Sequence, residues 1–291
     1  MTVAAHKRRL GLSGDSLAHL GSALKKQWKR YRKELRRCQE RFSEKAIHDS
    51  RVETRRLLAT LDLLCGFLPA GRVRKAERAL KSHLDSFDDL RDTQVQLKLV
   101  GKMRRRHPAA RKFYGFLLKR EDRLAAKTRR RIEDIKTGRL GKWICEFQER
   151  VEKHRKDCAP AQAGAILLRS LNRKFDHTSR LRAQLDPCDT RTIHCTRVAF
   201  KQFRYIVEAL AACLPFANER RLEAMHHYQT LMGDVQDAEV LLAGVDQYLC
   251  KHGIESKSAL RFRKELLDRR QRLIRNYLNA ADRLLEFWPP R

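Results

Sequence analysis

The sequence predicts an all-α protein, and three observations support this. Leu, Ala, Arg, Lys and Glu, which favour helices, dominate a chain of 291 residues. Apolar residues recur at helical spacing, and no segment alternates apolar and polar residues as a half-buried strand does. Prolines separate the long periodic segments, at positions 69, 108, 160, 187 and 215.

We expect eight helices. In chain order they cover residues 14–42, 46–66, 71–104, 109–136, 161–185, 190–213, 218–252 and 256–287. The segment 138–160 has the weakest periodicity, with one short helix expected around Trp143–Glu152. We therefore interpret residues 146–160 as a linker between a first half at 1–145, with a basic tail at 1–13, and a second half at 161–291.

An internal repeat supports the division into halves. Residues 47–64 read IHDSRVETRRLLATLDLL, and residues 193–210 read IHCTRVAFKQFRYIVEAL. At one constant offset, the matched positions are Ile47, His48, Arg51 and Val52 with Ile193, His194, Arg197 and Val198. Downstream, Asp89 and Asp92 correspond to Asp234 and Asp237. Because two helices alone cannot bury their apolar stripes, the repeated unit should be a four-helix bundle.

The net charge indicates a polyanionic partner. The chain has 65 Lys and Arg against 35 Asp and Glu, which leaves a formal charge of +30. Solubility requires a charge of only about 2–8. A larger excess repels itself and destabilises the folded state, so a partner of opposite charge is the usual reason that it is tolerated.

The repeated segment places cations on one helix face. His48, Arg51 and Arg55 are spaced i, i+3 and i+7 beside an apolar stripe. His194, Arg197 and Lys201 repeat the pattern, with Arg204 at the edge. Arg suits phosphate because its planar group donates two parallel hydrogen bonds. Two alternatives remain open: the face is simply solvated, or the histidines are buried structural groups near helix starts.

The first expected helix adds further cations. Lys25, Lys29, Arg32 and Arg36 follow an i, i+4, i+7, i+11 pattern. Arg173 and Arg180 are sparser counterparts in the second half. We expect the helices at 14–42, 46–66, 161–185 and 190–213 to line one shared basic groove.

Carboxylates near these cations should orient them. We expect Asp92 and Asp237 each to pair with an Arg. The alternative is a site for a hard cation such as Mg²⁺ at Asp85, Asp88 and Asp89. No P-loop, G-x-G-x-x-G, H-E-x-x-H or G-x-S-x-G motif occurs, and no nucleophile with a base is evident. We therefore predict neither an enzyme nor a bound cofactor.

The eight cysteines and the N-terminus favour a cytoplasmic protein. No two cysteines form a C-x-x-C pair, so we expect free thiols in a reducing compartment. No apolar run follows the N-terminal cations, and no stretch of 18 apolar residues exists. We expect neither a secretory signal nor a membrane span.

These residues resemble the CHAD domain family, named for conserved histidines in an α-helical domain. The resemblance covers residues 14–287 and is carried by His48, Arg51, Val52, Arg55, Arg56, His194, Arg197, Lys201, Arg204, Tyr205 and the pairs Arg91-Asp92 and Gln236-Asp237. It implies two pseudo-symmetric four-helix bundles around a basic central groove or pore, polyphosphate as the ligand, and no catalysis. The halves differ where Leu58 corresponds to Arg204, Gln202 to Arg56 and Gln236 to Arg91.

Our leading hypothesis is a polyphosphate-binding module, which could associate with polyphosphate granules. The residues assigned to binding are Lys25, Lys29, Arg32, Arg36, His48, Arg51, Arg55, Arg56, Arg173, Arg180, His194, Arg197, Lys201 and Arg204, with Asp92, Asp237 and Tyr205 in orienting or structural roles. A sequence-nonspecific nucleic-acid binder is the alternative, because phosphate contacts dominate affinity in both cases. Scarce aromatic residues argue against it, since single strands bind by stacking. A phosphate-transferring enzyme that uses His48 or His194 is a third hypothesis, which we consider weaker.

Overall fold

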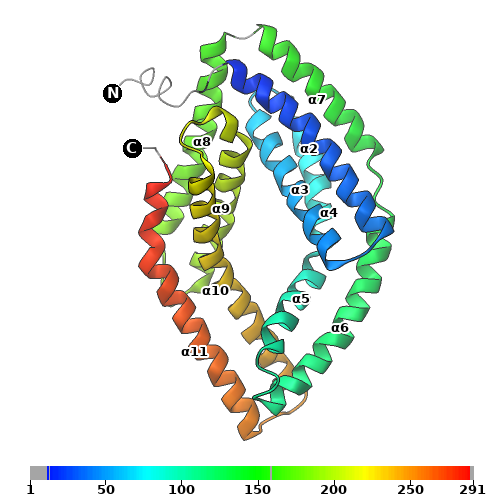
Figure 1. Ribbon diagram of the computed structural model, residues 1–291, viewed down its shortest axis with the longest axis vertical. Helices are drawn as coiled ribbons and strands as arrows, with labels where there is room; N and C mark the ends of the chain where they lie inside the picture. The colour runs from blue at the N-terminus through cyan, green and yellow to red at the C-terminus, as the bar shows by residue number, and fades with distance from the viewer. Residues whose placement is uncertain (1–11, 13, 158, 289–291) are drawn as a thin grey trace.

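The computed structural model describes residue 12, residues 14–157 and residues 159–288 (Figure 1). The basic tail predicted at 1–13 therefore lies outside the described residues, apart from Leu12. Within the described residues, all regular secondary structure is helical, which confirms the all-α prediction. The helices are α2 (Gly14–Glu40), α3 (Glu44–Leu64), α4 (Ala70–Asp85), α5 (Asp88–Gly101), α6 (Pro108–Glu133), α7 (Gly138–Asp157), α8 (Pro160–Ala183), α9 (Thr190–Ala209), η1 (Ala211–Cys213), α10 (Glu219–Lys251), α11 (Lys257–Ala280) and η2 (Ala281–Glu286).

The single helix predicted over 71–104 is wrong, because the chain breaks between α4 and α5. Ser86 and Phe87 separate the two helices, and Phe87 is buried in the core. Asp88 and Asp89 follow directly and occupy the first turn of α5. Acidic residues are stabilising at a helix N-terminus, where backbone N–H groups are free, and unfavourable inside the last turns. The acidic run therefore starts a new helix, whereas the matching segment of the second half remains one helix, α10.

The structure differs from the predicted linker as well. In place of a short helix inside a linker, the helix α7 extends from Gly138 to Asp157. Its buried residues are Leu140, Ile144, Phe147 and Val151. Their spacing of i, i+4, i+7 and i+11 forms one apolar stripe, and α7 packs with it against α2 and α4.

The two halves share their hydrophobic cores. The larger core contains residues of α2, α3, α4 and α7 together with residues of α8, α9, α10 and α11. The smaller core lies where α5 and α6 meet α10 and α11, at the lower end of Figure 1, and includes Leu97, Phe113, Leu241 and Phe262. Four helices of the first half contact their counterparts: α2 contacts α8, α3 contacts α9, α5 contacts α10 and α6 contacts α11. The repeat in the sequence is therefore a repeat in the packing.

Two further expectations concern the thiols and the membrane. The cysteines at positions 38, 65, 145, 188, 195, 213 and 250 are free thiols, and Cys158 lies outside the described residues. None of the helices described has the length and apolar character needed to cross a membrane.

A close approach of backbone to side chain joins the halves. Gly66 lies in the turn after α3, and a Cβ atom there would be 2.7 Å from the Cγ2 methyl group of Ile166 in α8. This methyl group branches at Cβ, next to the backbone, so it cannot swing away as the end of a flexible chain could. At Gly71, by contrast, a Cβ atom would meet nothing within 4 Å.

We expect Gly66→Ala to lower the free energy of unfolding by about 1–2 kcal/mol. Overpacking costs about 1–3 kcal/mol, which outweighs the roughly 0.4–1 kcal/mol gained by restricting the unfolded chain. Gly71→Ala, inside α4, should instead stabilise by up to about 1 kcal/mol. Urea unfolding measures both, and Gly66→Ala should cost little in an Ile166→Ala background. Equal stability of the two alanine variants would refute the predicted clash.

Candidate functional site

A pocket of about 400 Å³ lies between α3 and α9 and also touches α4 and α8. Its charged lining residues are Arg55, Asp62, Glu77, Lys81, Lys174, Arg197 and Lys201. The other lining residues are Leu58, Ala59, Leu84, Val198, Gln202 and Tyr205. The pocket therefore combines predicted ligand residues from both halves, Arg55 from one and Arg197 and Lys201 from the other.

Helix caps set the register of α3 and α9. The Ser43 side chain accepts a hydrogen bond from the Ala46 N–H, 3.2 Å away, which caps α3. The Asp189 side chain accepts one from the Arg191 N–H, 3.0 Å away, which caps α9. Such caps satisfy N–H groups that have no partner inside the helix. Each repeated histidine is consequently the fifth residue of its helix.

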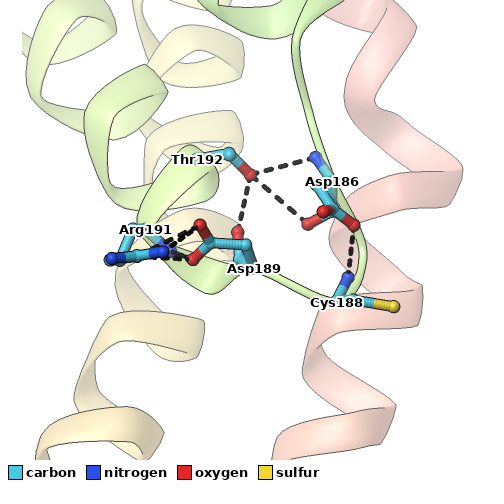
Figure 2. A network of polar contacts seen from close by, with 5 residues as sticks. All are labelled: Asp186, Cys188, Asp189, Arg191 and Thr192. Carbon is cyan, nitrogen blue, oxygen red and sulfur yellow. Dashed lines mark hydrogen bonds and ion pairs between the residues drawn. The ribbon is translucent and has the colours of Figure 1, made fainter.

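The turn before α9 is held by more than its cap (Figure 2). The Arg191 guanidinium lies beside the Asp189 carboxylate, with Nη2 2.8 Å from Oδ2. The Thr192 hydroxyl donates to the Asp189 carbonyl at 2.7 Å and accepts from the Asp186 N–H at 3.0 Å. Asp186 in turn accepts from the Cys188 N–H through its carboxylate, at 2.8 Å. These bonds fold the turn back on itself two residues before His194.

Arg51 and Arg197 occupy matching positions but differ in their partners. Arg51 is buried, and its Nη1 atom donates to the Leu84 carbonyl at 3.1 Å and to the Asp88 carboxylate at 2.7 Å. It thereby joins the end of α4 to the start of α5. The second half has no helix break at which Arg197 could find such partners, because α10 is continuous. Its Nε atom is buried without a hydrogen-bond partner.

Arg55, Arg197 and Lys201 form a cluster of cations without counterions, which we call the cation cluster. No carboxylate of the described residues forms an ion pair with any of the three. Burial lowers the pKa of Lys201 to about 6, and repulsion from Arg55 and Arg197 contributes. Burial, with repulsion from Arg51, likewise lowers the pKa of Arg55 to about 10. Both shifts mean that the site disfavours its own positive charge.

Other charged residues of the pocket lie near charges of opposite sign. Lys174 and Asp62 form an ion pair with a distance of 2.6 Å between Nζ and Oδ2, which links α8 to α3. Glu77 and Lys81 in α4 are one helical turn apart. The sequence analysis missed Lys81 and Lys174; the i, i+4 pair of Glu77 and Lys81 was visible, but nothing in it pointed to this pocket.

Asp92 and Asp237 do not pair with an Arg as predicted. Neither carboxylate has an ion-pair partner among the described residues, and Asp88 instead binds Arg51. Burial raises the pKa of Asp237, with Asp234 and Asp92 adding to the effect against the attraction of Arg197. Burial and Asp88 raise the pKa of Asp92 in the same way. The described residues contain no group of three or more His, Cys, Asp or Glu side chains that could hold a metal ion.

Both repeated histidines are exposed, so the alternative of buried structural groups is wrong. The His194 Nδ1 atom lies 2.6 Å from Gln236 Oε1, which makes Nδ1 the donor. Neighbouring atoms still remove part of the water around the His48 ring, and this partial desolvation lowers its pKa, as does Arg91, which corresponds to Gln236 in the repeat. Arg55 and Arg51 also lower it, so His48 lies close to the cation cluster.

Several predicted ligand residues do not line the pocket, because they bond to other side chains or are exposed on another face. Arg56 donates to Glu53 at 2.6 Å. Arg204 is buried, donates to Gln229 at 2.9 Å, and stacks over the Tyr205 ring with Cζ 4.5 Å from the ring centroid. Arg173 and Arg180 are exposed on α8 and do not line the pocket.

The prediction of one shared groove including the first helix is wrong. Lys25, Lys29, Arg32 and Arg36 line a different depression, between α2 and α7. No residue lines both this depression and the pocket between α3 and α9. The four cations do share one face of α2, as their spacing predicts. The apolar face of α2 packs against α3 and α8, so the cations face away from the pocket.

Comparisons with known proteins agree with this architecture. A search of curated proteins gives no match. The crystal structure of the CHAD domain from the plant Ricinus communis has a TM-score of 0.69 and 16% identity, covering 94% of this chain and 92% of that one. PptA from Streptomyces chartreusis has a TM-score of 0.62 and 16% identity, covering 94% and 99%. The family model of the CHAD domain matches residues 17–246. This chain therefore belongs to the CHAD domain family.

Proposed function

We propose that this protein binds inorganic polyphosphate in the pocket between α3 and α9 and does not cleave it. The cation cluster carries the proposal, because Arg55, Arg197 and Lys201 face one pocket from two helices without a counterion. A bound anion would also restore the charge of Lys201, whose pKa burial lowers to about 6. A chain of phosphates would supply several negative charges at once. His48 and His194 are exposed near the N-termini of α3 and α9, the helices that carry the cation cluster. They would add hydrogen bonds to the polyphosphate.

Membership of the CHAD family supports this ligand, which the resemblance noted in the sequence also implies. The pocket lining itself favours a chain without bases. Tyr205 is its only aromatic residue among the described ones, and the Arg204 guanidinium already covers that ring. Stacking on aromatic rings supplies much of the affinity for single-stranded nucleic acids. A nucleic acid would therefore gain little here beyond its phosphates.

The lining residues also favour binding over catalysis. Among the described lining residues there is no Ser, Thr or Cys nucleophile and no His base; the groups that could titrate are Asp62, Glu77, Tyr205 and the lysines. Asp62 is held in its ion pair with Lys174. We further propose a cytoplasmic protein that associates with polyphosphate granules, where long chains of the ligand would be concentrated.

Removing the cation cluster should weaken binding of long polyphosphate by at least about tenfold. The variant carries Arg55→Ala, Arg197→Ala and Lys201→Ala, and each lost charge-assisted hydrogen bond is worth about 1.5–3 kcal/mol. The matched control removes three exposed cations of α6, Arg111, Lys112 and Lys119. Fluorescence anisotropy at physiological salt measures both. Equal losses in the two variants would mean diffuse attraction to net charge and no specific site.

Lys201→Met should stabilise the free protein while weakening binding. A folded-state pKa near 6 lies below the unfolded value, so the charged lysine costs most below pH 6 and progressively less as the pH rises toward 10.5. The gain should exceed about 1.4 kcal/mol at pH 5.5, the free energy of one pKa unit. Lys174→Met is the control. It should lower the free energy of unfolding, because it removes the ion-pair partner of Asp62. Urea unfolding at pH 5.5 and pH 9 compares them, and a destabilised Lys201→Met variant would contradict the repulsion.

Polyphosphate affinity should fall as the pH rises above 6. A bound anion raises the pKa of Lys201, so binding takes up a proton between the free and bound pKa values. The loss is at most about tenfold per pH unit for one proton. Isothermal titration at pH 6 and pH 8 should show a smaller loss in Lys201→Arg, which keeps its charge. An unchanged loss in that variant would assign the proton to the histidines, and His48→Gln with His194→Gln would then abolish it.

A further inference from the structure

The depression between α2 and α7, which we call the outer groove, has a different character from the pocket. It encloses about 1230 Å³. Its Lys and Arg residues are Lys25, Lys26, Lys29, Arg32, Lys33, Arg36, Arg37 and Arg41. Glu40 is the one acidic residue among those described as lining it, and α7 contributes Cys145 and Gln148. Such a one-sided charge distribution attracts anions and repels other cations.

The outer groove is separate from the pocket. The buried face of α2, with Leu20, Leu24, Tyr31 and Leu35, lies between the groove and the interior. In Figure 1, α7 follows the outer side of α2, away from α9. An anion in the groove and an anion in the pocket would therefore contact different residues throughout.

Most cations of the outer groove lack counterions. Arg37 pairs with Glu34 and Asp49, both at 3.2 Å. No other Lys or Arg that lines the groove forms an ion pair within the described part of the chain. Lys29 and Arg32 lie between Lys25 and Arg36, which are eleven residues apart, or about 16 Å along a helix at 1.5 Å per residue. This row matches an extended polyanion lying parallel to α2, because a compact anion could reach only one or two of its members.

The aromatic residue of the groove is not free to stack on bases. The Trp28 ring is stacked on Tyr31, with 5.5 Å between centroids and 24° between planes. The Arg32 guanidinium lies over the same ring, 5.8 Å from its centroid. A Cβ atom at Gly141 in α7 would lie 3.3 Å from Cζ2 of Trp28, so α7 covers the edge of the ring. Tyr31, Arg32 and α7 thus already contact the partly exposed Trp28 ring, which favours a polymer that consists of phosphate alone.

We propose that the outer groove is a second, independent binding site for a phosphate polymer, so that one protein molecule holds two segments of polyphosphate. The groove site stands on its own observations, whereas the two-segment consequence rests on the proposed function of the pocket. Two sites on one chain let a long polymer gain avidity when its length spans them. They also let the protein cross-link different polymer chains into larger assemblies.

The test counts binding sites with a polyphosphate too short to reach both. The groove variant carries Lys25→Gln, Lys29→Gln and Arg36→Gln, which are exposed and leave the Trp28 contacts in place. The control carries Arg111→Gln, Lys112→Gln and Lys119→Gln on α6, with the same change in charge. Titration calorimetry should give two sites for the parent and the control, and one for the groove variant. With long polyphosphate, light scattering should show large assemblies for the parent and the control only.

The outcomes separate this inference from the function proposed for the pocket. Two sites in the groove variant, or one in the parent, overturn the inference. If the groove variant loses a site while removal of the cation cluster loses none, the groove stands and the pocket proposal fails. A short oligoadenylate serves as a competitor in the cation-cluster variant, where only the groove remains. Displacement of polyphosphate at equal phosphate concentration would overturn the assignment to a polymer without bases.

Discussion

Uncompensated positive charge between α3 and α9 is the constraint on which the rest of the structure depends. Arg55, Arg197 and Lys201 repel one another there, and burial removes the water that would screen them. The helices that carry them must be held together by other interactions. The shared core beneath them, the ion pair of Lys174 with Asp62 and the capped starts of both helices supply that stability. The scaffold therefore pays in stability for a site that is complete only when an anion occupies it.

Much of the fold could be predicted because local sequence patterns identify most of its helices. The apolar period, the prolines and the repeat identified most helices near their observed bounds. Two elements could not be read in this way. The acidic residues that start α5 were visible, but the break before them also depends on burial of the Phe87 ring and on the bond from Arg51 to the Leu84 carbonyl. The stripe of α7 was present in the sequence, but its helical extent follows from packing against α2 and α4.

The candidate site, like the fold, could be predicted in part from the sequence. The repeat placed Arg55 and Lys201 at matching positions, and the structure brings both to one pocket. The same repeat could not show that Arg51 and Arg197 have different partners. Arg51 bonds across the break between α4 and α5, whereas α10 is one continuous helix. Nor could it show that the cations of α2 face away from α9. Spacing within a helix determines which residues share a face, whereas the neighbouring helices determine where that face points.

The shared cores make each half depend on the other. Each half buries its apolar faces against the other, so a chain of half this length would expose Leu97 and Phe113 on one unit and Leu241 and Phe262 on its equivalent. A second copy could cover these residues if it packed as the two halves do here, with α2 against α8, α3 against α9, α5 against α10 and α6 against α11. The covalent link between the halves also allows them to differ. Arg51 holds a helix break together, while Arg197 at the matching position keeps an Nε atom without a partner.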